Sequence, residues 1–217
     1  MQPVDAIAFS WVWMSSSGLD RWTPGFLRNR FTQRWPGPDK HIKSMFRPQR
    51  FPFCRVHYPV TDWRVPVAFR DSSGFPHLNY YWGEGDDPTF LLHPKAEAAW
   101  INHYFFKSTE EFTWKRWRNI GSEKISESAL TSSSLRYFAY QHWSADLVDD
   151  DRILRCGRYF CEYYNEFLKI NGVPEILQEV SDKFRKKIDS IKTQLLNDPM
   201  FNDEDELVQR VLDRLKD

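Results

Sequence analysis

The chain has 217 residues, of which 41% are hydrophobic and 17% aromatic, and its thirty basic and thirty acidic side chains cancel. A neutral chain has no overall field that would draw it to nucleic acid or to an acidic lipid surface. Its three cysteines form no metal-binding pattern, and their odd count does not suit a disulfide framework. No apolar run approaches the ~18 residues of a membrane span, and the first residues lack the pattern of a signal peptide. We therefore expect a cytoplasmic protein without a transmembrane segment, with peripheral attachment to a membrane through a partner left open.

The first hundred residues predict extended segments. Residues 6–13 read as a strand buried on both faces, and such a strand usually lies in the middle of a sheet. Because it begins so early, we expect its neighbours to belong to sequence that this chain lacks. A short helix or turn is expected over residues 23–31, and strands over residues 41–48 and 55–60. Residues 62–95 are rich in turn-forming residues and predict a long ordered loop with one or two short strands.

A strand-to-helix junction follows. The apolar run over residues 98–106 predicts a strand that presents Asn102 and His103. Ser108 and Glu111 have the spacing of a capping box, which predicts that a helix opens there. A histidine at such a junction is a common way for α/β enzymes to direct a ligand group into a cleft. A histidine satisfied within the core is the alternative.

The C-terminal part predicts helices. Residues 126–134 read as a serine-rich linker, and apolar residues recur at helical spacing over residues 153–168, before the helix-ending pair Asn171-Gly172. An apolar stripe over residues 176–195 predicts a helix of about six turns. Acidic residues after Asn202 predict a capped start for a last helix.

Three segments carry groups suited to a charged, phosphorylated ligand. The chain has no Gly-rich phosphate loop, no GxSxG elbow, no HExxH motif and no zinc-type spacing. It does supply two imidazoles, several cations suited to phosphate oxygens, and aromatic surface. For Trp11 a core position is expected in preference to a sugar platform, and for Lys43 and Arg47 a solvated surface role remains the alternative. The segments are Trp11–Gly18, Lys43–Pro48 followed by His57, and Asn102–Phe112.

The order of these motifs resembles the C-terminal half of bacterial glycosyltransferases of families 2 and 92. The resemblance covers about residues 3–122. It departs from the family at Met14-Ser15, where a Phe-Gly pair is expected, and at Leu19, where a histidine is expected. The matching residues are Trp11…Ser16-Ser17-Gly18, Lys43…Arg47-Pro48…His57, and Asn102-His103-Tyr104-x-x-Lys107-Ser108-x-Glu110-Glu111-Phe112 with Lys115.

The resemblance implies an α/β fold and an enzymatic function. Residues 1–125 would form the acceptor-side half of a GT-A-like domain, an incomplete mixed sheet with flanking helices, and residues 126–217 a linker and helical extension. The activity would be transfer of a sugar from a nucleotide-sugar donor to a carbohydrate or glycan acceptor. In the family an Asp-x-Asp motif precedes the strand at Trp11, and residues 1–122 contain none. We therefore expect the chain to be inactive alone.

The resemblance also implies roles for named residues. A divalent metal, Mn²⁺ or Mg²⁺, would assist the transfer, with His57 as the first candidate ligand and His103 as the second. Lys43, Arg47 and Lys107 would offset the charge of the donor diphosphate. Asp20 or Glu110 would deprotonate the acceptor hydroxyl in an inverting transfer, with no geometric reason to choose between them. Glu111 is assigned to the helix cap.

Two further functions stay open. A non-catalytic interaction module, or a truncated remnant, would dock on a partner protein or self-associate through an exposed apolar patch on the sheet edge beside the Trp11 strand. The basic and aromatic residues 21–70 have the composition of a surface for single-stranded nucleic acid. The neutral net charge and the lack of an RNP-type motif argue against nucleic acid as a partner.

Overall fold

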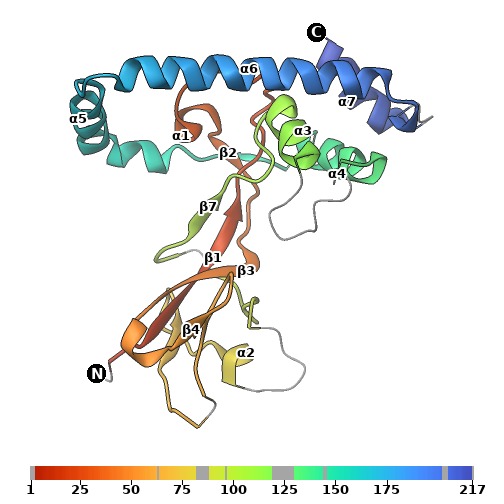
Figure 1. Ribbon diagram of the computed structural model, residues 1–217. Coiled ribbons are helices and arrows are strands. Elements are labelled where there is room, and N and C mark those ends of the chain that lie inside the picture. The colour runs from red at the N-terminus through yellow and green to blue at the C-terminus, as the bar shows by residue number, and fades with distance from the viewer. Residues whose placement is uncertain are drawn as a thin grey trace. The chain divides into compact units, whose positions relative to one another are not determined.

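The computed structural model describes residues 3–62, 64–81, 88–95, 97–118, 130–143, 146–201 and 205–216 (Figure 1). The chain is a mixed α/β protein that divides into two compact units. The sheet unit comprises Met1–Trp13 and Trp35–His103, and the helical unit comprises Met14–Arg34 and Tyr104–Asp217. The chain thus passes between the units after Trp13, Arg34 and His103, whereas the sequence analysis placed one boundary after residue 125.

The central strand of the sheet unit is β1 (Ala6–Trp13). It pairs antiparallel with β3 (Asp39–Phe46), and in parallel with β6 (Phe69–Asp71) at its start and β7 (Ile101–His103) at its end. The predicted mid-sheet position of β1 is confirmed. The expectation that its neighbours would come from missing earlier sequence is wrong, because all three pairing strands come from later in the chain.

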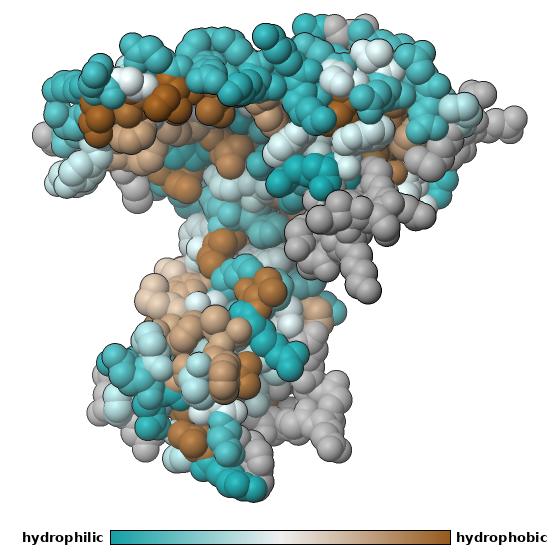
Figure 2. Space-filling view, in the orientation of Figure 1, coloured by the Kyte–Doolittle hydropathy of each residue, from teal (hydrophilic) through white to brown (hydrophobic). Residues whose placement is uncertain are grey.

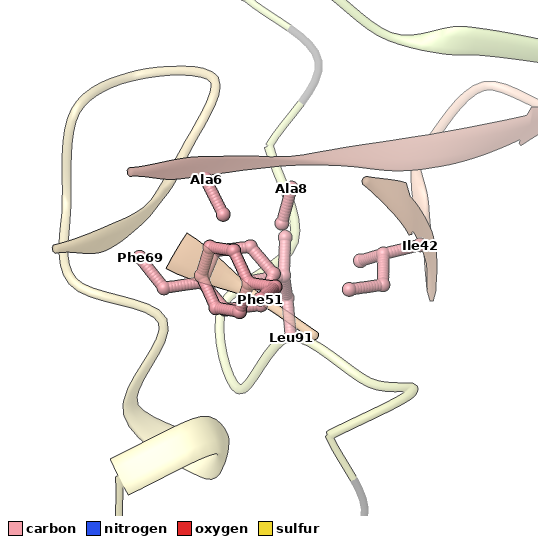
Figure 3. Close-up of a cluster of buried hydrophobic side chains, with 6 residues drawn as sticks. All are labelled: Ala6, Ala8, Ile42, Phe51, Phe69 and Leu91. Carbon is pink, nitrogen blue, oxygen red and sulfur yellow. The ribbon is translucent and has the colours of Figure 1, made fainter. Parts of the chain in front are cut away.

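A small apolar core lies under the first half of β1. Ala6 and Ala8 share one face of the strand because side chains alternate along it, and both are buried. In Figure 3 the rings of Phe51 and Phe69 lie against this face, together with Leu91. Alanine side chains at alternate positions leave room for these rings, which explains the absence of larger residues there.

The segment that carries His57 is a hairpin turn. After a 3₁₀ turn at Pro48–Arg50, β4 (Phe53–Cys54) pairs antiparallel with β5 (Pro59–Val60). The Arg55 N–H donates to the Tyr58 carbonyl at 2.8 Å, which closes the turn between them. The strand predicted over residues 55–60 is therefore wrong except at its last two residues.

Two other predictions for extended segments are partly correct. The loop over residues 62–95 contains a short strand, β6, as expected, and also the short helix α2 (Leu78–Tyr81), which was not expected; residues 63 and 82–87 lie outside the described part. The strand expected over residues 98–106 is reduced to β7. Phe106 lies beyond it, and its side chain is buried in the helical unit.

The helical unit is built mainly from helices in the second half of the chain, preceded by α1 (Leu27–Arg30). A two-residue strand β2 (Gln33–Arg34) pairs antiparallel with β8 (Val148–Asp149). The other elements are α3 (Thr109–Trp117), α4 (Ser132–His142), the 3₁₀ helix η2 (Arg152–Cys156), α5 (Gly157–Leu168), α6 (Val173–Asn197), η3 (Pro199–Phe201) and α7 (Glu206–Lys216).

The helix starts follow side-chain caps. The predicted capping box at α3 is confirmed, since Ser108 Oγ accepts from the Glu111 N–H at 3.3 Å and Glu111 Oε2 accepts from the Ser108 N–H at 3.4 Å. A second box, Thr131 with Ser134, opens α4 inside the segment predicted as a linker. That linker is wrong from Thr131 onward, and residues 126–129 lie outside the described part. Asp205 caps α7, while the predicted Asn202 also lies outside it.

The predicted stripe on α6 is half correct. Its second half, including Ile188, Ile191 and Leu195, is buried against the rest of the helical unit. Its first half is not, because Ile176 and Val180 are exposed. Among the described residues, no helix is long and apolar enough to cross a membrane.

Candidate functional site

Three histidines gather around one tryptophan in the sheet unit. The His103 ring stacks on the Trp11 indole with ring centroids 3.9 Å apart, and the His41 ring stacks with centroids 5.0 Å apart. The His57 ring is tilted against the same indole at 5.3 Å. We call Trp11, His41, His57 and His103 the Trp11 cluster. Both predicted ligand histidines, which are 46 positions apart (103 − 57) in the sequence, belong to it.

Each member of the Trp11 cluster comes from a different element. Trp11 lies on β1 next to the bulge at Ser10/Trp11, where the register with β3 shifts. His41 comes from β3, His57 from the β4–β5 turn and His103 from β7. His57 Nδ1 lies 2.9 Å from the carbonyl oxygen of Ile42, so this nitrogen is the donor and the ring is fixed to the neighbouring strand.

Trp11 is the buried residue against which the three imidazole rings pack. Only 7% of its surface is exposed, so it offers no open face for stacking on a sugar. Its indole Nε1 is buried and has no hydrogen-bond partner among the described residues. The groups that a ligand would meet are the partly exposed imidazoles around it. The core position expected for Trp11 is therefore confirmed.

The carboxylate of Asp39 and the ammonium group of Lys43 lie beside the Trp11 cluster. Asp39 Oδ1 accepts from the His41 N–H at 2.8 Å and lies 2.5 Å from His41 Nδ1. Burial alone would raise the pKa of Asp39, but hydrogen bonds from the His41 backbone and from the Trp13 and His41 side chains hold it below its usual value. The ionised carboxylate therefore orients the His41 ring. Lys43 Nζ lies 5.9 Å from the Trp11 ring centroid and donates to the Val56 carbonyl at 2.7 Å.

The described residues do not form a metal site. No three His, Cys, Asp or Glu side chains gather in the described part of the chain in a way that could hold a metal ion. His41, His57 and His103 meet around Trp11, but among the described residues they do not form a group that could hold a metal ion. The divalent metal implied by the resemblance therefore finds no fitting donor set here, and no chemistry is assigned to it.

The three predicted diphosphate-binding cations do not share one unit. Arg47 belongs to the sheet unit, where its Nε donates to the carbonyl of Val4 at 3.0 Å. Lys107 belongs to the helical unit and has a left-handed backbone, with φ at 58°. Lys43 lies beside the Trp11 cluster within the sheet unit. The Asn102–Phe112 block is likewise divided, with His103 in one unit and Lys107 in the other.

The two predicted catalytic carboxylates hold helices together. Glu110 is 2% exposed, and its oxygens accept from the Trp22 N–H at 2.7 Å and from the cations of Arg185 at 2.9 Å and Lys192 at 3.1 Å. Asp20 Oδ1 accepts from the Thr109 hydroxyl at 2.7 Å. Every Glu110 oxygen is thus engaged by α6 or by the Trp22 backbone, and this geometry assigns structural roles to both carboxylates.

His41 and Asp39 were missed by the sequence analysis. One signal for His41 was present, because it lies two positions before Lys43 and therefore on the same face of the predicted strand. No sequence signal identified Asp39, whose role depends on its bonds to His41 and Trp13.

Comparison of the chain with models of protein families, with curated proteins and with solved structures finds no match. The resemblance to glycosyltransferases therefore stays a prediction that depends on the residues quoted above.

Proposed function

We propose that the chain is the acceptor-side part of a glycosyltransferase that uses a nucleotide-sugar donor, and that the Trp11 cluster meets the phosphorylated part of that donor. The observation that supports the proposal most is the meeting of His57 and His103 on one indole. The two residues belong to separate motifs of the sequence, and the fold brings them to the same indole. A shared location is the minimum that a common ligand requires.

The chemistry of the Trp11 cluster suits a diphosphate. The Lys43 ammonium and the N–H groups of imidazolium rings are donors for phosphate oxygens, and such charge-assisted bonds are about twice as strong as neutral ones. The indole holds the His41 and His103 rings by stacking, so little rotational freedom is lost when a ligand binds. Asp39 orients His41 in the same way.

A binding experiment tests this function. The protein would be titrated by calorimetry with a panel of nucleotide-sugars, with and without Mn²⁺, alongside the variants His57→Gln and His103→Gln. Loss of one charge-assisted hydrogen bond weakens affinity by about tenfold or more. We expect that loss in each variant. The matched control is His93→Gln, because His93 is exposed in the same unit and lies outside the Trp11 cluster.

Two outcomes would overturn the proposal. One is the absence of binding to every nucleotide-sugar in the panel. The other is a set of equal affinities for the wild type, His57→Gln and His103→Gln, which would place any donor site elsewhere. A donor-hydrolysis assay under the same conditions then decides whether the chain is active alone.

Self-association is a second candidate function, and one surface favours it. Figure 2 shows apolar side chains over α5 and the first half of α6. The exposed apolar residues there are Tyr159, Phe160, Tyr163, Phe167, Ile170, Ile176 and Val180. This is not the sheet-edge patch that the sequence analysis expected, since β1 is flanked by β3 and β6 over Ala6–Ala8. The opposite charges beside it, such as Lys183 with Glu179, would let two copies meet without net repulsion.

Sedimentation of the wild type and of Tyr163→Glu tests this candidate. If a second copy covers α5, the wild type forms dimers and Tyr163→Glu is monomeric. Tyr140→Glu on α4 is the control, because Tyr140 and Tyr163 are 71% and 74% exposed. A monomeric wild type at all accessible concentrations would remove this candidate.

A further inference from the structure

The strongest unassigned feature is a group of cations at α3 in the helical unit. Lys107 lies just before the Ser108 cap, and Lys115 and Arg118 lie at the other end of the helix, three positions apart. Residues three and four apart share a helix face, so Glu111, Lys115 and Arg118 follow one face of α3. Lys107 precedes the helix, and its charge acts on Lys115. We call Lys107, Lys115 and Arg118 the basic cluster.

The negative charge of Glu111 is already balanced by an ion pair. Glu111 forms a two-pronged ion pair with Arg30, with nitrogen-to-oxygen distances of 2.8 and 3.1 Å. It also accepts from the Ser108 hydroxyl at 2.8 Å. The Glu111 charge is therefore balanced by Arg30, and the basic cluster with its neighbours keeps a net positive charge.

The pKa values of Lys107 and Lys115 reflect this excess of positive charge. Burial lowers the pKa of Lys115 to about 8, assisted by the positive charges of Lys107, Arg118 and Arg116. Burial also lowers the pKa of Lys107, where Arg30 and Arg118 add to the effect and Glu111 opposes it. Cations held this close while partly removed from water gain from any anion that enters between them.

Aromatic rings hold two of the cations in place. Lys115 Nζ lies 3.8 Å from the centroid of the Phe105 ring, and Arg118 Cζ lies 4.2 Å from that of the Trp114 ring. Cation–π contacts of this kind restrict long side chains that would otherwise move freely. A preorganised set of donors loses less entropy when it binds a ligand.

We propose that the basic cluster binds a phosphate or diphosphate group of a small molecule. Two lysines act as point charges for phosphate oxygens, and the Arg118 guanidinium offers a fork that matches two of them. The resemblance already assigned Lys107 to a donor diphosphate. This inference adds Lys115 and Arg118 and is argued from the helical unit by itself, because the Trp11 cluster contains none of these residues.

The test uses inorganic pyrophosphate as the probe, measured by calorimetry at constant ionic strength. We expect saturable binding that weakens by about tenfold in Lys115→Gln and in Lys107→Gln. Lys186→Gln is the matched control, because Lys186 is exposed on α6 in the same unit. The titrations are repeated in a His57→Gln background, in which any binding by the Trp11 cluster is weakened, so that the binding lost on adding Lys115→Gln belongs to the basic cluster. His93→Gln is a second control, because His93 is exposed and lies outside both clusters.

Proton uptake gives a readout that needs no variant. An anion beside Lys115 raises its pKa, so binding at about pH 8 takes up protons, which calorimetry in buffers of different ionisation enthalpy detects. Lys115→Gln abolishes this uptake. The same variant raises the melting temperature at neutral pH, because a lysine with a lowered pKa in the folded state costs stability wherever it is protonated.

The inference is overturned if pyrophosphate does not saturate the wild type. It is also overturned if Lys186→Gln weakens binding as much as Lys115→Gln does, since binding would then follow general surface charge. Absence of proton uptake on binding would place the anion away from Lys115.

Discussion

At the scale of single residues, the role that a sequence pattern implies can differ from the role that the contacts in the fold indicate. Glu110 lies in the block that resembles glycosyltransferases, so the resemblance implied a catalytic base. In the structure it is a buried carboxylate held between Trp22, Arg185 and Lys192. A base that must accept a proton from a substrate needs an oxygen that the substrate can reach, and both Glu110 oxygens are engaged.

Replacing Glu110 distinguishes the two roles. We expect Glu110→Gln to lower the free energy of unfolding by about 3 kcal/mol, because it leaves the cations of Arg185 and Lys192 without their buried carboxylate. Urea denaturation measures the change. Glu166→Gln is the control, since its pair with Lys169 is exposed and contributes little. A variant of unchanged stability that has lost sugar transfer would return the catalytic role to Glu110.

Asp150 gives a pH-dependent prediction. Hydrogen bonds from Arg152, with a further one from Arg34, lower the pKa of Asp150 to about 2. The ionised form is therefore favoured in the folded state, and the stabilisation is present above the unfolded pKa and lost as the pH falls through about 2. We expect Asp150→Asn to lower the free energy of unfolding by about 2 kcal/mol at neutral pH.

The test follows unfolding of both proteins in urea as the pH is lowered from about 7 to about 2. The difference between wild type and Asp150→Asn should shrink below about pH 4, where Asp150 of the unfolded chain becomes protonated. A difference that stays constant over the whole range would mean that Asp150 contributes through packing and not through its charge.

At the scale of elements, the helix starts were the most predictable features. Caps depend on residues within one turn of each other, so Ser108 with Glu111 could be recognised from spacing alone. The same rule also applies to Thr131 with Ser134, which the serine-rich composition of that segment obscured. The turn at His57 was harder, because Arg55–Tyr58 closes only when β4 and β5 pair.

The α3 cap should be measurably important. Ser108→Ala removes the acceptor for the Glu111 N–H and the donor to the Glu111 carboxylate, so we expect a loss of about 2 kcal/mol in the free energy of unfolding. Chemical denaturation measures it, with Ser190→Ala as the control. That change in the exposed middle of α6 should be neutral or slightly stabilising. Equal effects in the two variants would argue against the cap.

At the scale of the whole molecule, the division into units was not predictable from sequence pattern. The patterns predict elements one at a time, and a boundary after residue 125 followed from the change in composition there. The structure instead assigns residues 14–34 to the helical unit, with the later helices. Long-range contacts such as Trp22 with Glu110, or Arg34 with Asp150, leave no local signal in the chain. For the same reason, the sequence did not predict that the His41 ring stacks on Trp11.

Two separate cores predict two separable responses to core mutations. Ile42 is buried in the sheet unit and Leu195 in the helical unit, and truncation of either to alanine should cost about 2–5 kcal/mol. If each unit has its own stability, Ile42→Ala accelerates amide hydrogen exchange in β1 and β3 and leaves α6 and α7 unchanged, while Leu195→Ala does the reverse. Mass spectrometry of peptides from these four elements measures both. Uniform acceleration over the whole chain in either variant would mean that the two units unfold as one cooperative structure, because loss of one core would then remove the protection of the other.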